Sequence, residues 1–222
     1  MEKGKIIVVE GACDGMGKST QTGLLLEYLK ETRQSVLTHH FPSYGKTHGT
    51  IVEAYLKGEY GASSSTLNPY TVHSIYAIDR ALEWHQSLQR PYEEGSTILF
   101  DRYTTSSLIY QSVNFETLAE KKDFIKFACD FEYEKLKIGK PDQILFLYAD
   151  FDLITEIRNR RITNDGVTND IHERDIAYMR KVYENSMFIA DYLGWDMIKC
   201  DSENSLKTAL EIHEDVKKMI KI

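Results

Sequence analysis

The sequence predicts an α/β fold of three layers, in which a five-stranded parallel sheet has helices on both faces. Short, continuous apolar runs such as residues 6–9, 98–100 and 144–147 recur along the chain, as in strands that are buried on both faces. Segments with helical periodicity separate these runs, which predicts helical crossovers between parallel strands. In such a sheet, ligands bind at the carboxyl ends of the strands.

The first half of the chain holds two of the expected strands. Lys5–Glu10 is apolar almost without interruption and is the first strand. Lys18–Arg33 is a helix, because its apolar residues fall on one face. Ser35–Phe41 returns as the second strand. Two more helices are expected before the third strand, namely Ile51–Lys57 and Asn68–Gln89, the latter ended by Pro91 and Gly95.

The second half continues the alternation of strands and helices. Thr97–Asp101 and Ile144–Tyr148 are continuous apolar runs and form the third and fourth strands. Helical segments fill the chain after the third strand as far as about Leu136. The remaining expected elements are a helix that starts near Asp152, a polar loop Asn164–Asn169, a helix Asp170–Leu193, a strand Asp196–Cys200 and a final helix with Leu206, Leu210, Val216 and Ile220.

Length and composition favour one domain, residues 1–222. The chain carries 27 Lys and Arg against 34 Asp and Glu, and its net charge of −7 argues against a broad nucleic-acid-binding surface. The three cysteines are odd in number and widely spaced, which favours reduced thiols in the cytoplasm. No apolar run reaches membrane-spanning length, and the first residues leave no room for a signal peptide. We therefore expect a cytoplasmic protein that binds neither nucleic acid nor a membrane.

A glycine-rich turn between the first strand and the first helix predicts a P-loop. Gly15 and Gly17 leave room for backbone N–H groups to curl around phosphate oxygens. Lys18 places a positive charge beside the terminal phosphates, and Ser19 offers a hydroxyl to Mg²⁺. Gly11 is separated from Gly17 by five residues rather than the usual four, so the match is slightly irregular. The residues expected around a nucleoside triphosphate are Gly11, Ala12, Cys13, Asp14, Gly15, Met16, Gly17, Lys18, Ser19 and Thr20.

A second polar cluster follows the third strand, where Asp101, Arg102 and Tyr103 stand at its carboxyl end. Asp101 can bind Mg²⁺ or a water on it, and Arg102 has the planar fork that suits a phosphate. The alternative is an Asp-Arg pair that only caps the following helix.

Taken together, these motifs resemble the thymidylate kinase family, whose members phosphorylate thymidine monophosphate (dTMP) with ATP. The resemblance spans nearly the whole chain and rests on Glu10-Gly11, Asp14–Gln21, Phe41-Pro42, His73–Arg80, Asp101-Arg102-Tyr103, Ser106, Tyr110-Gln111, Pro141-Asp142 and His213-Glu214-Asp215. It implies a homodimer packed through helices, a P-loop kinase fold with ATP and Mg²⁺, and an acceptor site near the P-loop.

The resemblance also implies roles for individual residues. Asp14 approaches the sugar and the acceptor phosphate, and Arg102 binds that phosphate. Tyr76 stacks on thymine, and Arg80 hydrogen-bonds the base. Tyr110 crowds the 2′ side of the sugar. The remaining residues that it places in the acceptor site are Phe41, Pro42, Tyr44, Ser106 and Gln111. Tyr76 and Tyr110, taken alone, are also typical of core aromatic residues.

Two departures from the family pattern concern charge. Many relatives carry an arginine close after the proline of Phe41-Pro42, where this chain has Ser43 and Tyr44. The P-loop also lacks an arginine, so the catalytic cation is expected from the lid, at about residues 158–173. Three arginines cluster at its start, namely Arg158, Arg160 and Arg161. They also fit a solvated basic face at a helix end.

Other activities stay open at this point. The chain could phosphorylate another monophosphate, such as uridylate or deoxyguanylate. It could also be a deoxynucleoside kinase, for which Glu10 is the candidate base, because a sugar hydroxyl must be deprotonated. A P-loop protein that binds a nucleotide without catalysis is a third alternative.

Overall fold

A five-stranded parallel sheet forms the centre of the protein. The computed structural model describes residues 2–32, 34–61, 66–156, 176–203 and 205–221. The strands are β1 (Ile6–Gly11), β2 (Val36–His40), β3 (Thr97–Asp101), β4 (Gln143–Tyr148) and β5 (Asp196–Lys199). They pair in the order β2-β3-β1-β4-β5 and all run parallel. The predicted sheet is confirmed.

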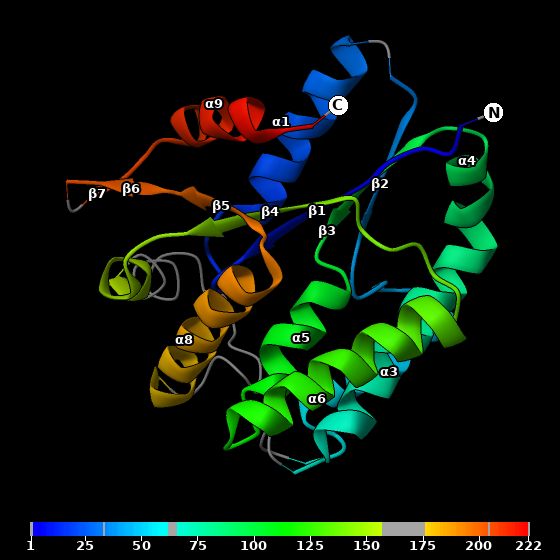
Figure 1. Ribbon diagram of the computed structural model, residues 1–222, viewed down its shortest axis with the longest axis vertical. Coiled ribbons are helices and arrows are strands. Elements are labelled where there is room, and N and C mark those ends of the chain that lie inside the picture. Colours follow the sequence, from blue (N-terminus) through cyan, green and yellow to red (C-terminus); the bar gives the residue numbers. More distant parts are fainter. Residues whose placement is uncertain (1, 33, 62–65, 157–175, 204, 222) are drawn as a thin grey trace.

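Helices cover both faces of this sheet. Figure 1 shows α1 and α9 on one face and α5, α6 and α8 on the other. The helices with their bounds are α1 (Lys18–Glu31), η1 (Thr47–Gly49), α2 (Thr50–Lys57), α3 (Pro69–Glu83), η2 (Trp84–Leu88), α4 (Gln89–Glu93), α5 (Thr104–Ser112), α6 (Leu118–Cys129), η3 (Asp130–Lys135), residues 151–156, α8 (Ile176–Leu193) and α9 (Ala209–Met219).

Side-chain caps fix the starts of several helices. Asn68 accepts a hydrogen bond at the start of α3, which also has a proline in its first turn. Thr117 and Glu120 form a capping box before α6, and Thr208 and Glu211 form another before α9. These polar signals lie in the sequence itself, so local chemistry sets the boundaries.

Burial explains why the ends of β1 and β3 are held firmly. Every residue of both strands is buried, whereas β2 is an edge strand and is partly exposed. The side chains of Ile7 and Val9 pack into one hydrophobic cluster, and those of Ile6 and Val8 pack into another. Because β1 alternates between two packed cores, its carboxyl end cannot shift without disturbing both.

The third long helix extends further than the sequence suggests. It was expected to end before Pro91, but helical structure continues through η2 and α4 to Glu93. η2 is a π-helical turn, in which the Gln89 N–H donates to the carbonyl of Trp84, five residues earlier. Pro91 follows this turn as the third residue of α4.

Other differences are local. The short antiparallel pair β6 (Asp201–Ser202) and β7 (Ser205–Leu206) was not predicted. The polar loop at residues 164–169 and the predicted start of the next helix at Asp170 lie outside the described residues, and the described part of that helix is α8. No helix among the residues with described structure is long and apolar enough to cross a membrane.

Candidate active site

The residues from Gly11 to Thr20 form the turn between β1 and α1 together with the first turn of α1. Gly15 and Gly17 adopt left-handed backbone conformations, with φ of +90° and +81°. Side chains other than hydrogen rarely tolerate these angles. Gly17 is the N-cap of α1, so the turn brings N–H groups and the positive end of the helix dipole to the carboxyl edge of the sheet.

Lys18 folds back over this turn. Its buried ammonium donates to the carbonyl oxygen of Cys13 at 2.9 Å and to Oδ1 of Asp14 at 3.1 Å. A Cβ atom at position 11 would lie only 3.2 Å from Cγ of Lys18. Gly11 therefore gives the lysine stem room, although it stands one residue away from the usual motif position.

Ser19 and Asp101 form an oxygen-rich corner beside the P-loop. The Ser19 hydroxyl donates to Oδ2 of Asp101 at 2.5 Å. Oδ1 of Asp101 is buried and has no hydrogen-bond partner among the described residues. Nδ1 of His40 lies 3.1 Å from Oδ2. Burial opposes ionisation, but hydrogen bonds with His40 and Ser19 outweigh it and hold the pKa of Asp101 below its ordinary value.

This corner fits Mg²⁺. The ion favours oxygen ligands and usually takes only one or two from the protein, with the remainder from water and substrate phosphates. Oδ1 of Asp101, which has no hydrogen-bond partner among the described residues, and the hydroxyl of Ser19 are oxygen atoms of the kind that this ion favours. In the described part of the chain, no group of three or more His, Cys, Asp or Glu side chains could hold a metal by itself.

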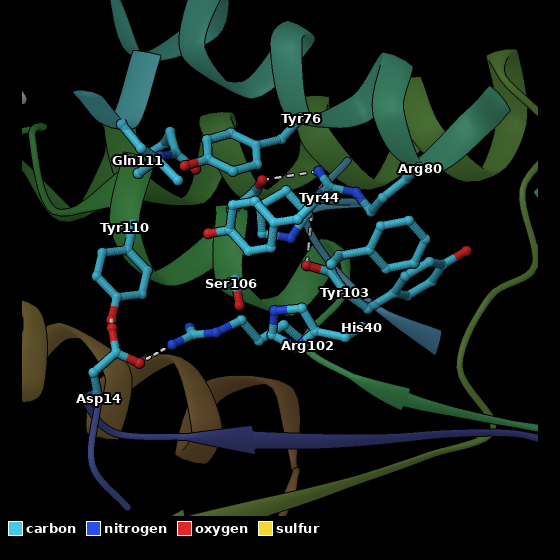
Figure 2. A pocket seen from close by; sticks show the side chains of 14 residues that line it. Asp14, His40, Tyr44, Tyr76, Arg80, Arg102, Tyr103, Ser106, Tyr110 and Gln111 are labelled. Carbon is cyan, nitrogen blue, oxygen red and sulfur yellow. Dashed lines mark hydrogen bonds and ion pairs between the residues drawn. The ribbon is translucent and has the colours of Figure 1, made fainter. Parts of the chain in front are cut away.

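One pocket beside the P-loop gathers the residues predicted to bind the acceptor. Figure 2 shows its side chains converging from the P-loop, the end of β2, α3 and α5. Those predicted from the sequence are Asp14, Phe41, Pro42, Tyr44, Tyr76, Arg80, Arg102, Ser106, Tyr110 and Gln111. The pocket is also lined by His40, Leu56, Tyr103 and Ser107, which the sequence analysis did not assign to it.

Arg102 and Asp14 form an ion pair at one end of this pocket (Figure 2). Arg102 has a left-handed backbone, with φ of +66°, and its N–H donates to the carbonyl of Val9 at 3.2 Å. Such a conformation is uncommon for residues other than glycine and often occurs at functional sites. The Tyr110 hydroxyl points at Asp14 across a distance of 3.5 Å. Burial raises the pKa of Tyr110, so its phenol is neutral.

The other end of the pocket combines an aromatic ring, donors and an unpaired acceptor. Tyr76 and Arg80 project from successive turns of α3, as their spacing predicts. Gln111 comes from α5, and its buried Oε1 has no hydrogen-bond partner among the described residues. A planar ligand with adjacent donor and acceptor groups would satisfy both Arg80 and Gln111.

Glu10 does not line the acceptor pocket. Its buried carboxylate accepts hydrogen bonds from the hydroxyls of Thr105 at 2.8 Å and Ser106 at 2.5 Å. These contacts tie the end of β1 to the first turn of α5. Among the residues that line the described pocket, Asp14 is the one carboxylate, and it pairs with Arg102.

Ser43 and Tyr44, the two residues that follow Pro42, point in different directions. Ser43 turns away from the pocket, because its N–H donates to Oδ2 of Asp79 at 2.9 Å and its hydroxyl lies 3.0 Å from Nε2 of His39. Nδ1 of His48 lies 2.7 Å from the other oxygen of Asp79. Tyr44 instead lines the pocket.

Comparison with known proteins agrees with this geometry. The sequence model of the thymidylate kinase family matches residues 9–212. The chain belongs to the thymidylate kinase family. The thymidylate kinase of Caldicellulosiruptor saccharolyticus is 30% identical over 218 residues, which cover 98% of this chain and 96% of the relative. That of Mycobacterium tuberculosis is 31% identical over 180 residues, which cover 79% and 81%.

Solved structures support the fold of this thymidylate kinase family member. The thymidylate kinase of Candida albicans superposes with a TM-score of 0.70 at 22% identity, over 98% of this chain and 91% of that one. The thymidylate kinase of Ehrlichia chaffeensis gives a TM-score of 0.67 at 18% identity, over 99% and 100%. The expected P-loop kinase fold is thereby confirmed.

The lid and its arginines, Arg158, Arg160 and Arg161, lie outside the described residues. Conversely, Glu132 contacts Arg80 through two hydrogen bonds but was not predicted. Its spacing of seven residues from Ile125 and four from Ala128 is the sequence signal that could have placed it on the inner helix face.

Proposed function

We propose that this protein transfers the γ-phosphoryl group of ATP to dTMP and so forms thymidine diphosphate. The observation that carries the proposal is the acceptor pocket, which begins at the P-loop with Asp14 and Arg102 and ends at Tyr76 and Arg80. A monophosphate in this pocket places its phosphate at the P-loop and its base against α3.

The base end of the pocket suits thymine. Arg80 can only donate hydrogen bonds, and Oε1 of Gln111 accepts. Thymine presents a carbonyl oxygen next to a ring N–H, so it satisfies both side chains. Cytosine presents an amino group where thymine has that carbonyl, which leaves two donors facing one another. The ring of Tyr76 supplies a stacking surface.

The sugar and phosphate end suits a deoxyribose monophosphate. Tyr110 stands beside Asp14 and is expected to crowd a ribose 2′-hydroxyl. Arg102 presents a planar fork to the acceptor phosphate. That phosphate is already anionic, so its attack on ATP needs positioning and charge stabilisation rather than a general base.

The P-loop forms the end of the proposed site that binds ATP, the phosphoryl donor. Lys18 and the N–H groups of the turn bind the phosphates of ATP, and the lid arginines supply the cation at the transition state. Ser19 and Asp101 would hold Mg²⁺. When bound, the ion neutralises charge on the phosphates. The P-loop, the lid arginines and Mg²⁺ would all act by stabilising charge. This agrees with the absence of a covalent intermediate in this class of reaction.

We further infer a cytoplasmic homodimer of single-domain chains. Ile78 and Leu82 on α3 and Phe127 on α6 are large apolar side chains that remain exposed in one copy, and such a surface suits a second copy of the chain. Cys13, Cys129 and Cys200 form no disulfide bond with one another, as in a reducing compartment. Sedimentation equilibrium measures the mass directly.

Product analysis tests the proposed reaction. The protein is incubated with ATP and Mg²⁺ and with dTMP, thymidine or no acceptor, and the nucleotides are separated by chromatography. We expect ADP and thymidine diphosphate only with dTMP, and neither when EDTA removes the metal. Formation of dTMP from thymidine would show a nucleoside kinase instead. No product with any acceptor would support a nucleotide-binding protein without catalysis.

A further inference from the structure

Arg80 is held by a buried carboxylate on another helical segment. Nε of Arg80 donates to Oε2 of Glu132 at 2.7 Å, and Nη2 donates to Oε1 at 2.7 Å. Both side chains are almost entirely excluded from solvent, at 2% and 0% exposure. This two-point contact fixes the plane of the guanidinium as well as its position.

The remaining contacts leave one edge of the guanidinium for the pocket. Nη2 also donates to the Ser107 hydroxyl at 2.9 Å, whereas the contact of Nη1 with the Tyr103 carbonyl is long, at 3.5 Å. A guanidinium carries five N–H donors, so Nη1 keeps donor capacity for a ligand. Figure 2 shows Arg80 reaching from α3 into the pocket near Tyr76.

Glu132 lies on the buried face that runs from α6 into the next helical segment. It lies in η3, a π-helical segment that follows α6 directly. It stands seven residues after Ile125 and four after Ala128, which are both buried, so the three side chains share one helix face. Thr104, in the first turn of α5, also donates to Oε2 of Glu132 at 2.9 Å. The carboxylate thus joins three helical segments behind the pocket wall.

Stability alone does not account for this buried pair. Taking two charges out of water carries a desolvation cost that their attraction often only offsets, so apolar residues of the same volume could replace them. A functional reason is that Glu132 neutralises Arg80 and directs it. The guanidinium then offers one oriented N–H to an uncharged carbonyl group.

We propose that Glu132 is a positioning residue for nucleobase selection, which acts by holding Nη1 of Arg80 toward the base. This inference rests on the proposed dTMP kinase activity. A pyrimidine with a carbonyl at C4 accepts the Arg80 N–H, whereas a pyrimidine with an amino group there cannot. Glu132 therefore supports the choice of a 4-oxo pyrimidine nucleotide over a 4-amino one.

Steady-state kinetics of Glu132→Gln test this role, because the variant keeps the shape of the side chain but loses its charge. We expect the KM for dTMP to rise by about tenfold or more, with kcat and the KM for ATP within about threefold of wild type. The ratio of kcat/KM for dTMP to that for dCMP should fall. Glu134→Gln is the matched control, since Glu134 lies in the same π-helical segment but is exposed.

A double variant tests whether Glu132 acts through Arg80. In an Arg80→Met background, the further change Glu132→Gln should alter the KM for dTMP by less than about twofold, because the partner is already absent. An equal rise in both backgrounds would overturn the proposal, and so would a Glu132→Gln enzyme with wild-type KM and base selectivity. If circular dichroism shows that Glu132→Gln does not fold, Glu132→Asp replaces it. This variant keeps the negative charge but moves it away from Arg80, and it must show the same loss of base selectivity.

Failure of the two proposals can be told apart. A wild-type protein that does not phosphorylate dTMP would overturn the reaction and the role of Glu132 together. A wild-type protein that does so, with Glu132→Gln unaltered, would overturn only the role of Glu132.

Discussion

The hydroxyl of Ser19 donates a 2.5 Å hydrogen bond to the carboxylate of Asp101, although the two residues are 82 positions apart in sequence. Parallel pairing explains the contact, because Val9 of β1 lies in register with Asp101 of β3, and the P-loop starts where β1 ends. The pairing of the two strands therefore brings together Ser19 and Asp101, the residues proposed to bind Mg²⁺.

Lys18→Ala should abolish most phosphoryl transfer while the protein stays folded. The ammonium contacts only the Cys13 carbonyl and the Asp14 carboxylate among the described residues, so its loss removes charge rather than core packing. We expect kcat to fall by about 10²-fold or more. Lys30→Ala is the control, because Lys30 lies on the exposed side of the same helix. Normal turnover of Lys18→Ala would refute the P-loop assignment.

One lid arginine should be essential for turnover. Replacing Arg158, Arg160 and Arg161 singly by alanine is expected to lower kcat by about 10³-fold in one case, as for arginine fingers. Arg90→Ala, at an exposed position that pairs with Glu94, serves for comparison. Three variants with near-normal kcat would place the catalytic cation elsewhere.

Tyr44→Arg should lower the KM for dTMP. Tyr44 lines the acceptor pocket and is 56% exposed, so a longer cationic side chain can reach the phosphate without displacing core residues. The matched variant is Ser43→Arg, which should destabilise the protein instead, because Ser43 is buried against Asp79. A lower KM for dTMP in Ser43→Arg and an unchanged KM in Tyr44→Arg would show that position 43, rather than position 44, faces the acceptor phosphate.

His73 should make the protein less stable as the pH falls from 6.5 to 4. Burial lowers the pKa of His73 from 6.5 to about 4, so the unfolded chain binds a proton in this range that the folded chain does not. Each pH unit then costs at most about 1.4 kcal/mol of unfolding free energy, and the loss from this residue stops below pH 4. His73→Phe, which suits the surrounding rings of Phe124, Phe127 and Phe131, should flatten this slope in urea denaturation. An identical slope in the variant would show that other groups cause it.

The fold was predictable where burial leaves a clear pattern. Strands such as β1 and β3 are buried on both faces and read as continuous apolar runs. The end of the third helix was not predictable, because Pro91 normally ends a helix and nothing in the sequence announces the π-turn of η2.

The candidate site was also predictable only in part. Tyr76 and Arg80 could be placed together because they are one helical turn apart, and Asp101 and Arg102 because they follow a strand. Glu132 follows the buried residues Ile125 and Ala128 at helical spacing, whereas Glu134 is exposed. The spacing could have placed Glu132 on the inner face, but its pairing with Arg80 depends on a contact that is distant in sequence. The separate directions of Ser43 and Tyr44 likewise depend on the contact between Ser43 and Asp79, which is distant in sequence.

The measurement that tests the central claim most directly is kcat/KM for dTMP beside dUMP, UMP and dGMP, with ATP and Mg²⁺ held fixed. We expect dTMP to exceed all of them. The loss of one methyl contact is worth about 1–3 kcal/mol, or roughly 10–200-fold, so dUMP should remain a detectable substrate. UMP should be far poorer, because we propose that Tyr110 crowds the 2′ side of the sugar. A kcat/KM for UMP or dGMP that equals or exceeds that for dTMP would contradict the account.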